Sequence, residues 1–558
     1  MRHIIIQEYL SSLKEDNELD FLFPLLLDNM GFKVISTPKN SKGQSQYGKD
    51  IVAIGIDENG KKWKWYFELK GYTSKDITEH TFGIEDGIRE SLLEAKDIDF
   101  KSCSIPGFNE LPTKYVLVHN GVLKENFRQR FESFIEKNFE KDSFERWGIE
   151  KLTELFSEHL FDEYLFADEE SYILMKRTLV LLDTPSENYS SLNKLIQIQF
   201  NKCDKTSRPE DRKAIKLFSS LWLICSLIDK YSDEYNNLTP SKYCINLVTL
   251  KCWAFILKKK WNNNKAIVSK FTNLLNLQIE IYFKYINKTY SIASATKGLY
   301  SFGKTDTESV CYPLRCFQYL NDLLFFSFVC EYTCKSNKRK DLRKKQIQFI
   351  KKIVEANSGF DMALLDTNSI TILYLISYIA GDECSDEDIV FIDNYISRVI
   401  QNMIIRFRRN KMLPEIDGNE MALAHSLYNK SEDYIDDSSL LILNLAEIVA
   451  WLNNEELYEL IKTLVNESGV DLQMVYPISN DELEIQLFEG DVTHNVATET
   501  SIKLPESIVK FQNTFRKECQ QIDFKVDHTG FPYLKILAHM FYKIDLFPSE
   551  INFSFIEQ

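Results

Sequence analysis

Residues Tyr47–Gly71, YGKDIVAIGIDENGKKWKWYFELKG, contain the pattern that decides the fold of the N-terminal part of the chain. Ile51–Ile56 is a short run rich in β-branched residues, and the segment after residue 61 alternates between apolar and polar side chains. Both patterns are typical of β-strands. Asp57-Glu58-Asn59-Gly60 lies between them and is typical of a hairpin turn. The apolar side of the second strand comprises Trp63, Trp65, Phe67 and Leu69, and the other side comprises Lys62, Lys64, Tyr66, Glu68 and Lys70.

The length of the hairpin loop decides whether Asp50 faces Glu68, because moving the register by one residue turns a strand's side chains to the opposite face. A two-residue loop, Asn59-Gly60, would separate Asp50 from the face that carries Glu68 and Lys70. A three-residue loop, Glu58-Asn59-Gly60 with the glycine in the left-handed region, would place Asp50 directly across from Glu68. We expect the three-residue loop.

This register would bring two carboxylates and an ammonium group together. Asp50 and Glu68 lie on neighbouring strands, and Lys70 follows Glu68 by two residues. Carboxylate oxygens are the ligands that hard divalent cations prefer, and a positive side chain beside them can act on a reacting phosphate. The pattern therefore favours a metal site that acts on phosphate esters. An ordinary hairpin with a solvated polar face is the alternative.

The order Asp50, then Glu68-Leu69-Lys70, resembles the Asp…Glu-x-Lys signature of the restriction-endonuclease-like PD-(D/E)XK nuclease superfamily, in particular its Mrr-like branch. Gly48 fits as well, since that branch often has a glycine two residues before the aspartate. The resemblance is confined to the N-terminal domain. It implies hydrolysis of phosphodiester bonds with Mg²⁺ or Mn²⁺, in DNA rather than RNA.

The resemblance also implies roles for individual residues. Asp50 and Glu68 would bind the metal ion, and the main-chain carbonyl of Leu69 could add a ligand. Lys70 would orient the attacking water or help to deprotonate it. An acidic residue on the first helix of such enzymes often faces the metal, which makes Glu18 a candidate. The alternative for Glu18 is a surface glutamate that the helix dipole favours in a first turn.

The same resemblance suggests a bacterial defence role against foreign DNA, with the rest of the chain sensing, positioning or restraining the nuclease. Double-strand breaks would need paired active sites, so a homo-oligomer or a regulatory protein partner is implied. The alternative function is a catalytically inactive nuclease fold that serves as a scaffold for nucleic acid or protein.

Length and composition set broad limits. A chain of 558 residues exceeds what one core usually fills, so two or three domains are expected. The net charge of −15 argues against broad adhesion to nucleic acid, so contacts with phosphates must come from local basic patches. The 11 cysteines, an odd number without a secretory leader before them, predict reduced thiols in the cytoplasm. No apolar run is long enough to predict a membrane span.

The succession of predicted elements gives an α/β domain over residues 1–170. Helices are expected over Glu18–Met30, 83–96 and Glu125–Asn138, and strands over Lys33–Thr37 and Tyr115–Val118, besides the hairpin. A last short strand over residues 144–149 and a closing helix complete this restriction-endonuclease-like core. Residues 188–467 read as a large, mostly α-helical domain, and residues 468–558 as a small α+β C-terminal piece with a strand over 484–488.

Three further features of the sequence give weaker evidence of function. Gly298–Thr305 satisfies the phosphate-loop pattern GxxxxGK[ST], but it lacks a convincing strand before it, and we interpret it as a chance match in an interhelical loop. Two basic runs, Lys335–Lys345 and Arg406–Lys411, could contact nucleic acid or could be solvated helix ends. His119 follows a predicted strand, where a structural hydrogen bond is the commoner role.

Overall fold

The computed structural model describes residues 2–37, 47–71, 75–84, 87–159, 168–182, 184, 189–302, 307–381, 384–479, 482–515 and 522–547. The chain divides into two compact units. The first comprises Met1–Val248 and Trp261–Leu274, and the second comprises Thr249–Lys260 and Leu275–Gln558. Helices α10 (Thr239–Lys258) and α11 (Lys265–Ala293) therefore contribute residues to both units.

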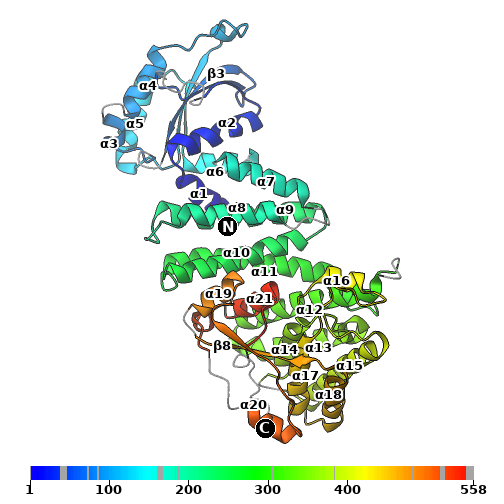
Figure 1. Cartoon of the computed structure of the whole chain (residues 1–558). Coiled ribbons are helices and arrows are strands. Elements are labelled where there is room, and N and C mark those ends of the chain that lie inside the picture. Colours follow the sequence, from blue (N-terminus) through cyan, green and yellow to red (C-terminus); the bar gives the residue numbers. More distant parts are fainter. Residues whose placement is uncertain are drawn as a thin grey trace. The chain divides into compact units, whose positions relative to one another are not determined.

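The first unit contains a mixed five-stranded sheet in the order β1-β2-β3-β4-β5 (Figure 1). The strands are β1 (Lys33–Ser36), β2 (Ile51–Ile56), β3 (Lys62–Lys70), β4 (Thr113–His119) and β5 (Phe144–Trp147). The first three strands form an antiparallel meander, whereas β4 and β5 run parallel to β3. The parallel pairing of β3 with β4 requires a crossover connection, and α4 lies within it.

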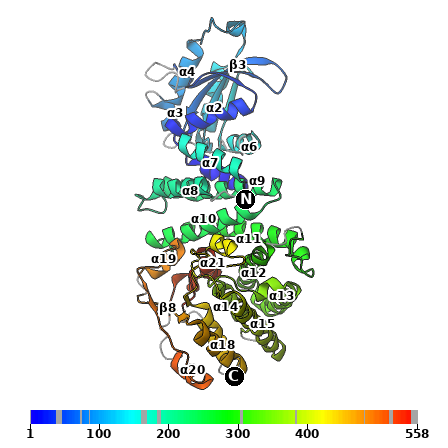
Figure 2. The same ribbon diagram turned by 45° about the vertical axis from the view of Figure 1, so that its right-hand side comes forward.

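Helices precede, connect and follow these strands (Figure 2). They are α1 (Arg2–Ser11), the π-helical turn η1 (Glu15–Leu19), α2 (Asp20–Asn29), α3 (Glu79–Gly83), α4 (Ile88–Asp97), the 3₁₀ turn η3 (Phe108–Glu110), α5 (Glu125–Asn138), α6 (Ile149–His159), α7 (Glu169–Leu181), α8 (Ser190–Cys203) and α9 (Arg212–Glu234). Helices α7, α8 and α9 belong to the same compact unit as the sheet, so the units separate further along the chain than residue 170.

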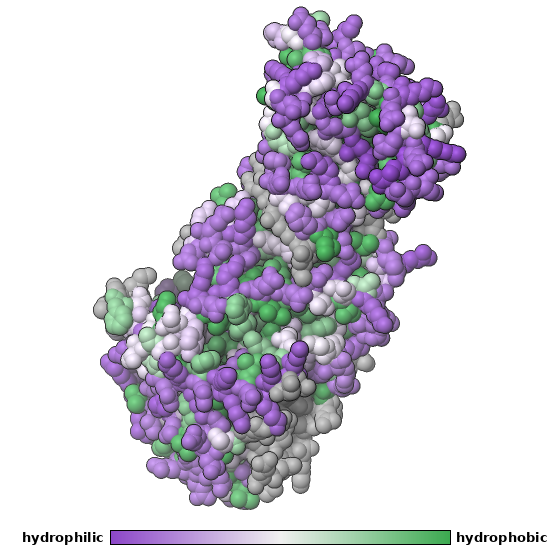
Figure 3. Space-filling view, turned by 180° about the vertical axis from the view of Figure 1, so that it is seen from behind, coloured by the Kyte–Doolittle hydropathy of each residue, from purple (hydrophilic) through white to green (hydrophobic). Residues whose placement is uncertain are grey.

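Apolar side chains pack on both faces of the sheet. On one face Phe67 packs edge-on against Phe23 of α2 and Trp147 of β5, with ring centroids 5.2 and 5.5 Å apart. On the other face Leu117 of β4 shares a core cluster with Leu92 of α4. The outer surface of this unit, at the top of Figure 3, is accordingly mostly hydrophilic in that view.

The hairpin has the predicted register. Ile51 pairs with Phe67 and Ile56 with Lys62, and the Asp57 N–H donates to the carbonyl of Lys61 (2.9 Å). Only residues 58–60 remain outside this ladder, and Gly60 has a φ of 78°. The three-residue loop with a left-handed glycine is therefore confirmed.

The polar side of β3 is mostly buried, and only Lys62 at its start is exposed. Lys64, Tyr66 and Glu68 are 2%, 2% and 4% exposed. The Lys64 ammonium reaches Asp99 at 2.6 Å, and Tyr66 packs against Tyr115 of β4. The alternative of an ordinary hairpin with a solvated face is therefore wrong, and Glu68 must find compensation for its charge inside the protein.

The elements of the first unit match the predicted ones except in two places. The helix expected over Glu125–Asn138 has these bounds, whereas the one expected over residues 83–96 begins only at Ile88, as α4, and a separate short helix, α3, ends at Gly83. The first helix was expected to begin at Glu18, but a π-helical turn begins at Glu15 and continues into α2 at Asp20. The Glu18 carboxylate accepts the N–H of Lys14 (2.8 Å), so it holds the start of this turn.

The second unit is mostly helical, with two short two-stranded sheets. Its helices after α11 are α12 (Glu308–Thr333), α13 (Ser336–Ala356), η5 (Ser358–Asp361), α14 (Asn368–Ile379), α15 (Asp386–Asn410), α16 (Glu420–His425), α17 (Leu441–Trp451), α18 (Glu455–Ser468), α19 (Leu483–Glu489), α20 (Ile508–Phe515), η6 (Lys525–His528) and α21 (Tyr533–Tyr542). Its strands are β6 (Ser438–Ser439), β7 (Asp471–Leu472), β8 (Met474–Pro477) and β9 (Val496–Glu499). Of the helices in the described parts of the chain, none has both the length and the apolar character of a bilayer-crossing segment.

The C-terminal residues do contain helices and short strands, but they share a core with the preceding helices. Phe511 of α20 and Ile536 of α21 belong to the same buried cluster as Leu320 and Leu445. The strand expected over residues 484–488 is wrong, because this segment is helix α19. Glu484 in that helix accepts hydrogen bonds from Trp253 Nε1 and from two main-chain N–H groups, which a surface strand would not need.

The phosphate-loop pattern at Gly298–Thr305 follows a helix. Helix α11 ends at Ala293, so Gly298 is not preceded by the strand that such a loop requires. Gly303, Lys304 and Thr305 lie outside the described residues.

Two buried carboxylates give the second unit a pH dependence. Burial, and then the charge of Asp366, raises the pKa of Asp545 to about 7, while burial raises the pKa of Asp366 to about 6. Since the folded state keeps these protons to a higher pH than the unfolded chain, the free energy of unfolding is expected to fall between about pH 4 and pH 7. Asp545→Asn should therefore raise the midpoint of thermal unfolding more at pH 8 than at pH 4.5, as measured by circular dichroism. The exposed Asp433→Asn is the control, and an equal shift of Asp545→Asn at both pH values would contradict the prediction.

Candidate active site

The carboxyl end of β3 and the residue before β2 form one cluster. Lys70 Nζ lies 2.8 Å from Glu68 Oε1. The Asp50 N–H donates to the carbonyl of Phe67 (2.9 Å), and the Asp50 carboxylate accepts the N–H of Leu69 (2.7 Å). The structure thus brings Asp50, Glu68 and Lys70 together, as the predicted register requires. The hydrogen bond from Leu69 fixes the Asp50 carboxylate.

Glu15, which sequence reasoning missed, completes the cluster. Its Oε1 lies 3.5 Å from Lys70 Nζ, and its Oε2 accepts the N–H of Gly71 (3.3 Å). Glu15 therefore occupies the position beside the lysine that was expected for an acidic residue of the first helix. The lysine is in contact with two carboxylates, one from β3 and one from the π-helical turn.

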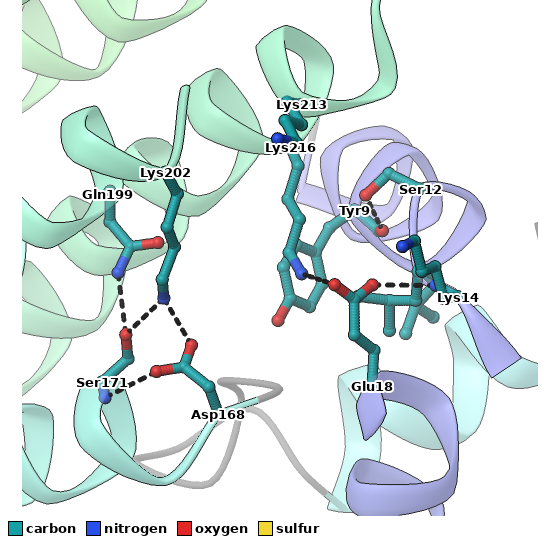
Figure 4. Close-up of polar contacts among 12 residues, drawn as sticks. Tyr9, Ser12, Lys14, Glu18, Asp168, Ser171, Gln199, Lys202, Lys213 and Lys216 are labelled. Atoms are coloured by element: carbon teal, nitrogen blue, oxygen red, sulfur yellow. Dashed lines mark hydrogen bonds and ion pairs between the residues drawn. The ribbon is translucent and has the colours of Figure 1, made fainter. Parts of the chain in front are cut away.

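Glu18 lies elsewhere. Figure 4 shows its carboxylate between Lys216 of α9 and the main chain of Lys14. The distance from Lys216 Nζ to Glu18 Oε1 is 3.0 Å. Glu18 therefore links the π-helical turn to α9 and does not join Asp50 and Glu68.

Two glycines allow the close backbone contacts that assemble the cluster. A Cβ atom on Gly71 would lie 2.4 Å from the main-chain N of Glu15. A Cβ atom on Gly48 would lie 1.8 Å from the carbonyl oxygen of Ser91 in α4, and Gly48 also has a φ of 66°. Gly71 thus sets the approach of Glu15, and Gly48 sets the path of the chain into Asp50.

Gly71→Ala is expected to lower the free energy of unfolding by about 1–3 kcal/mol, because the new methyl group must push the π-helical turn away from β3. Denaturant unfolding of the full chain measures this change. Gly83→Ala is the matched control, since a Cβ atom there meets nothing within 4 Å. Equal effects of the two substitutions would mean that the Gly71 contact does not constrain Glu15.

Burial shapes the electrostatics of the cluster. Burial, and next the charge of Glu68, raises the pKa of Asp50 well above its ordinary value. Burial also raises the pKa of Glu15. For Lys70 burial alone would lower the pKa, but the carboxylates of Glu68, Glu15 and Asp50 together raise it. Lys70 therefore keeps its proton, which favours orienting the water over deprotonating it.

Three carboxylates against one ammonium leave the cluster with two negative charges when all four groups are ionised. Lys49, a buried cation next to Asp50 in the chain, does not cancel this excess. Its Nζ donates to the carbonyl of Tyr47 (2.8 Å), and burial lowers its pKa to about 8. The negative charges of Asp99 and Glu94 act on the Lys49 ammonium more strongly than the charge of Glu68 does. A divalent cation would balance the charge that remains.

One oxygen of the cluster is left without a partner. Glu68 Oε2 is buried and accepts no hydrogen bond from the described residues. A buried carboxylate oxygen in this state is costly unless a cation or water completes it. In the part of the chain that the structure describes, no three His, Cys, Asp or Glu side chains are gathered as ligands of one ion. An ion at Asp50 and Glu68 would therefore need water and main-chain oxygen to complete its coordination, as is common for Mg²⁺.

His119 adjoins the cluster but has a structural role. It is in register with Lys70 on the neighbouring strand. Its Nδ1 is 2.8 Å from the carbonyl of Lys75, and Arg146 Nη1 is 2.8 Å from its Nε2. Burial lowers the pKa of His119 to about 4, so the ring is neutral, with Nδ1 donating and Nε2 accepting. This confirms that His119 is a hydrogen-bonding residue of the fold.

Fold and site together define an α/β domain whose mixed sheet carries a buried cluster of carboxylates and one lysine beside the end of its central strand. No protein-family model, no curated protein and no solved structure matches this chain.

Proposed function

We propose that the first unit is a metal-dependent nuclease that hydrolyses phosphodiester bonds, with DNA as the substrate. The observation that carries the proposal is the meeting of Asp50, Glu68 and Lys70 in one buried cluster with excess negative charge. Lys70 touches both Glu68 and Glu15, so its ammonium group is held in place beside the carboxylates. The Asp…Glu-x-Lys order and the sheet of three antiparallel strands followed by parallel ones also support it.

Each residue has a role that follows from its chemistry. Asp50 and Glu68 would hold Mg²⁺ or Mn²⁺, with the carbonyl of Leu69 as the further ligand that the resemblance implies. Such an ion, when bound, lowers the pKa of a coordinated water and neutralises charge on a phosphate. Lys70 orients the attacking water and offsets developing negative charge as a cation. Glu15 positions Lys70 through their contact and adds negative charge to the site.

The biological setting follows from the resemblance to restriction-endonuclease-like effectors. We propose a role in bacterial defence against foreign DNA, with the helical second unit regulating the nuclease. A homodimer or a regulatory protein would supply the paired sites that double-strand cleavage needs.

The proposal is tested by incubating the purified full chain with supercoiled plasmid, linear duplex DNA and RNA, each with Mg²⁺, Mn²⁺ or a chelator. Metal-dependent cutting of DNA that is lost in Asp50→Ala is the expected result. Cutting that persists in both Asp50→Ala and Glu68→Ala would remove these residues from the mechanism. Binding of DNA in a gel-shift assay without any cutting would favour the catalytically inactive scaffold.

A further inference from the structure

The second unit contains a cavity that the nuclease proposal does not use. It has a volume of about 580 Å³ and lies beside the last two turns of α15. Residues from the start of α12, from the segment after η5 and from the region around α16 complete its wall. Typical pockets for small molecules have volumes of about 300–1,000 Å³. The cavity is therefore large enough for a ligand of ordinary metabolite size.

A guanidinium group without an acidic partner lines this cavity. Arg406 Nη2 donates to the hydroxyl of Tyr434 (3.0 Å), but Arg406 Nη1 is buried and has no hydrogen-bond partner among the described residues. Asp436, whose charge acts on Arg406, already forms an ion pair with Lys430 and accepts the N–H of Leu413 (2.9 Å). A half-buried cation in this state is costly unless an anion pairs with it.

A second arginine lines the same cavity one turn further along α15. Arg409 forms no ion pair within the described parts of the chain, whereas its neighbour Arg408 pairs with Glu467 at 3.8 Å and does not line the cavity. Phe407 between them is buried in the core. Within the basic run Arg406–Lys411, the helix therefore turns Arg406 and Arg409 toward one cavity and Arg408 away from it.

The rest of the wall suits an apolar or aromatic group. Met362, Met403 and Met412 line it, and methionine adapts well to flat or irregular ligands. Tyr428 also lines the cavity and is 71% exposed, so its ring is available for stacking. One part of the cavity therefore offers positive charge, and another part offers apolar and aromatic surface.

We propose that this cavity binds a small molecule that joins an anionic group, phosphate or carboxylate, to an apolar or aromatic body. Arg406 and Arg409 bind the anionic group, because guanidinium groups match both phosphate and carboxylate with paired N–H donors. The methionines and Tyr428 contact the body of the ligand. A cavity of about 580 Å³ with apolar and aromatic surface beside its arginines suits a small molecule better than a nucleic-acid backbone.

Calorimetric titration of the full chain tests the proposal with two probes of the same shape, 1-naphthyl phosphate and 1-naphthoate. Inorganic phosphate and 1-naphthol represent the two halves of the ligand. We expect at least one of the anionic naphthyl probes to bind at least tenfold more tightly than either half. Which probe binds better tells whether the natural anionic group is a phosphate or a carboxylate. If neither binds, or if 1-naphthol binds as tightly as both, the proposal is overturned.

Variants of the arginines locate the binding. Arg406→Gln and Arg409→Gln are each expected to weaken binding of the anionic probe at least tenfold, whereas Arg408→Gln leaves it unchanged. Arg409 is exposed, so Arg409→Gln carries the test alone if the half-buried Arg406→Gln destabilises the unit. Unchanged binding in Arg409→Gln would overturn the assignment. The readout is binding and needs no nuclease activity, so it stands apart from the proposed function.

Discussion

Glu68→Gln is expected to reduce metal-dependent cleavage of DNA by about 10³-fold while the protein stays folded. The substitution keeps an oxygen for the 2.8 Å contact with Lys70 and replaces an oxygen that has no partner, so the fold loses little. It removes one negative charge from the place where Asp50 and Glu68 would share an ion. Cleavage rates and Mg²⁺-dependent thermal stabilisation of the full chain measure both effects.

The matched control for this prediction is Glu18→Gln. Glu18 is also a glutamate in an ion pair with a lysine, but it is half-buried and its partner is Lys216 of α9. We expect its cleavage rate to stay within a few-fold of the unsubstituted protein. A large loss in Glu18→Gln together with full activity in Glu68→Gln would reverse the assignment of the two residues.

The hairpin could be predicted in detail because its determinants are local. The alternation of residues 62–70 fixes which side chains share a face, and a glycine that can take the left-handed conformation at the third loop position favoured the three-residue loop over the two-residue one. These two features placed Asp50 beside Glu68 before any long-range contact was considered. The burial of Lys64 and Tyr66 could not be read from the same pattern, because it depends on Asp99 and Tyr115 far along the chain.

Glu15 could not be predicted because the phase of the first helix is set by tertiary contacts. Several acidic residues lie within residues 15–20. A helix that is expected to begin at Glu18 makes Glu18, and not Glu15, the acid of its first turn. The π-helical turn and the close approach of Gly71 bring Glu15 to Lys70. A glycine directly after the motif lysine was the one available signal.

The strand predicted over residues 484–488 was wrong for a similar reason. A short alternation of apolar and polar residues does not distinguish a strand from a buried helix such as α19.

Lys70→Met is expected to abolish most of the cleavage activity and to tighten Mg²⁺ binding at the same time. Removing the ammonium leaves the carboxylates of Glu15, Asp50 and Glu68 without a cation, and losing one partner of a buried ion pair costs about 3–5 kcal/mol. Mg²⁺ no longer competes with a lysine for these carboxylates, so it should raise the unfolding midpoint of this variant more than that of the unsubstituted protein.

The pH dependence of Lys70→Met has a definite sign. The folded protein raises the pKa of Asp50 and of Glu15, so it binds protons that the unfolded chain has already released. The contribution of this proton binding to the free energy of unfolding is present at low pH and is lost as the pH rises. The destabilisation should therefore be smaller at pH 5 than at pH 8. Lys216→Met, which breaks the pair with Glu18, is the control and should show no gain in Mg²⁺ stabilisation. Weaker Mg²⁺ binding in Lys70→Met than in the unsubstituted protein would show that the lysine helps to build the ion site and does not compete for it.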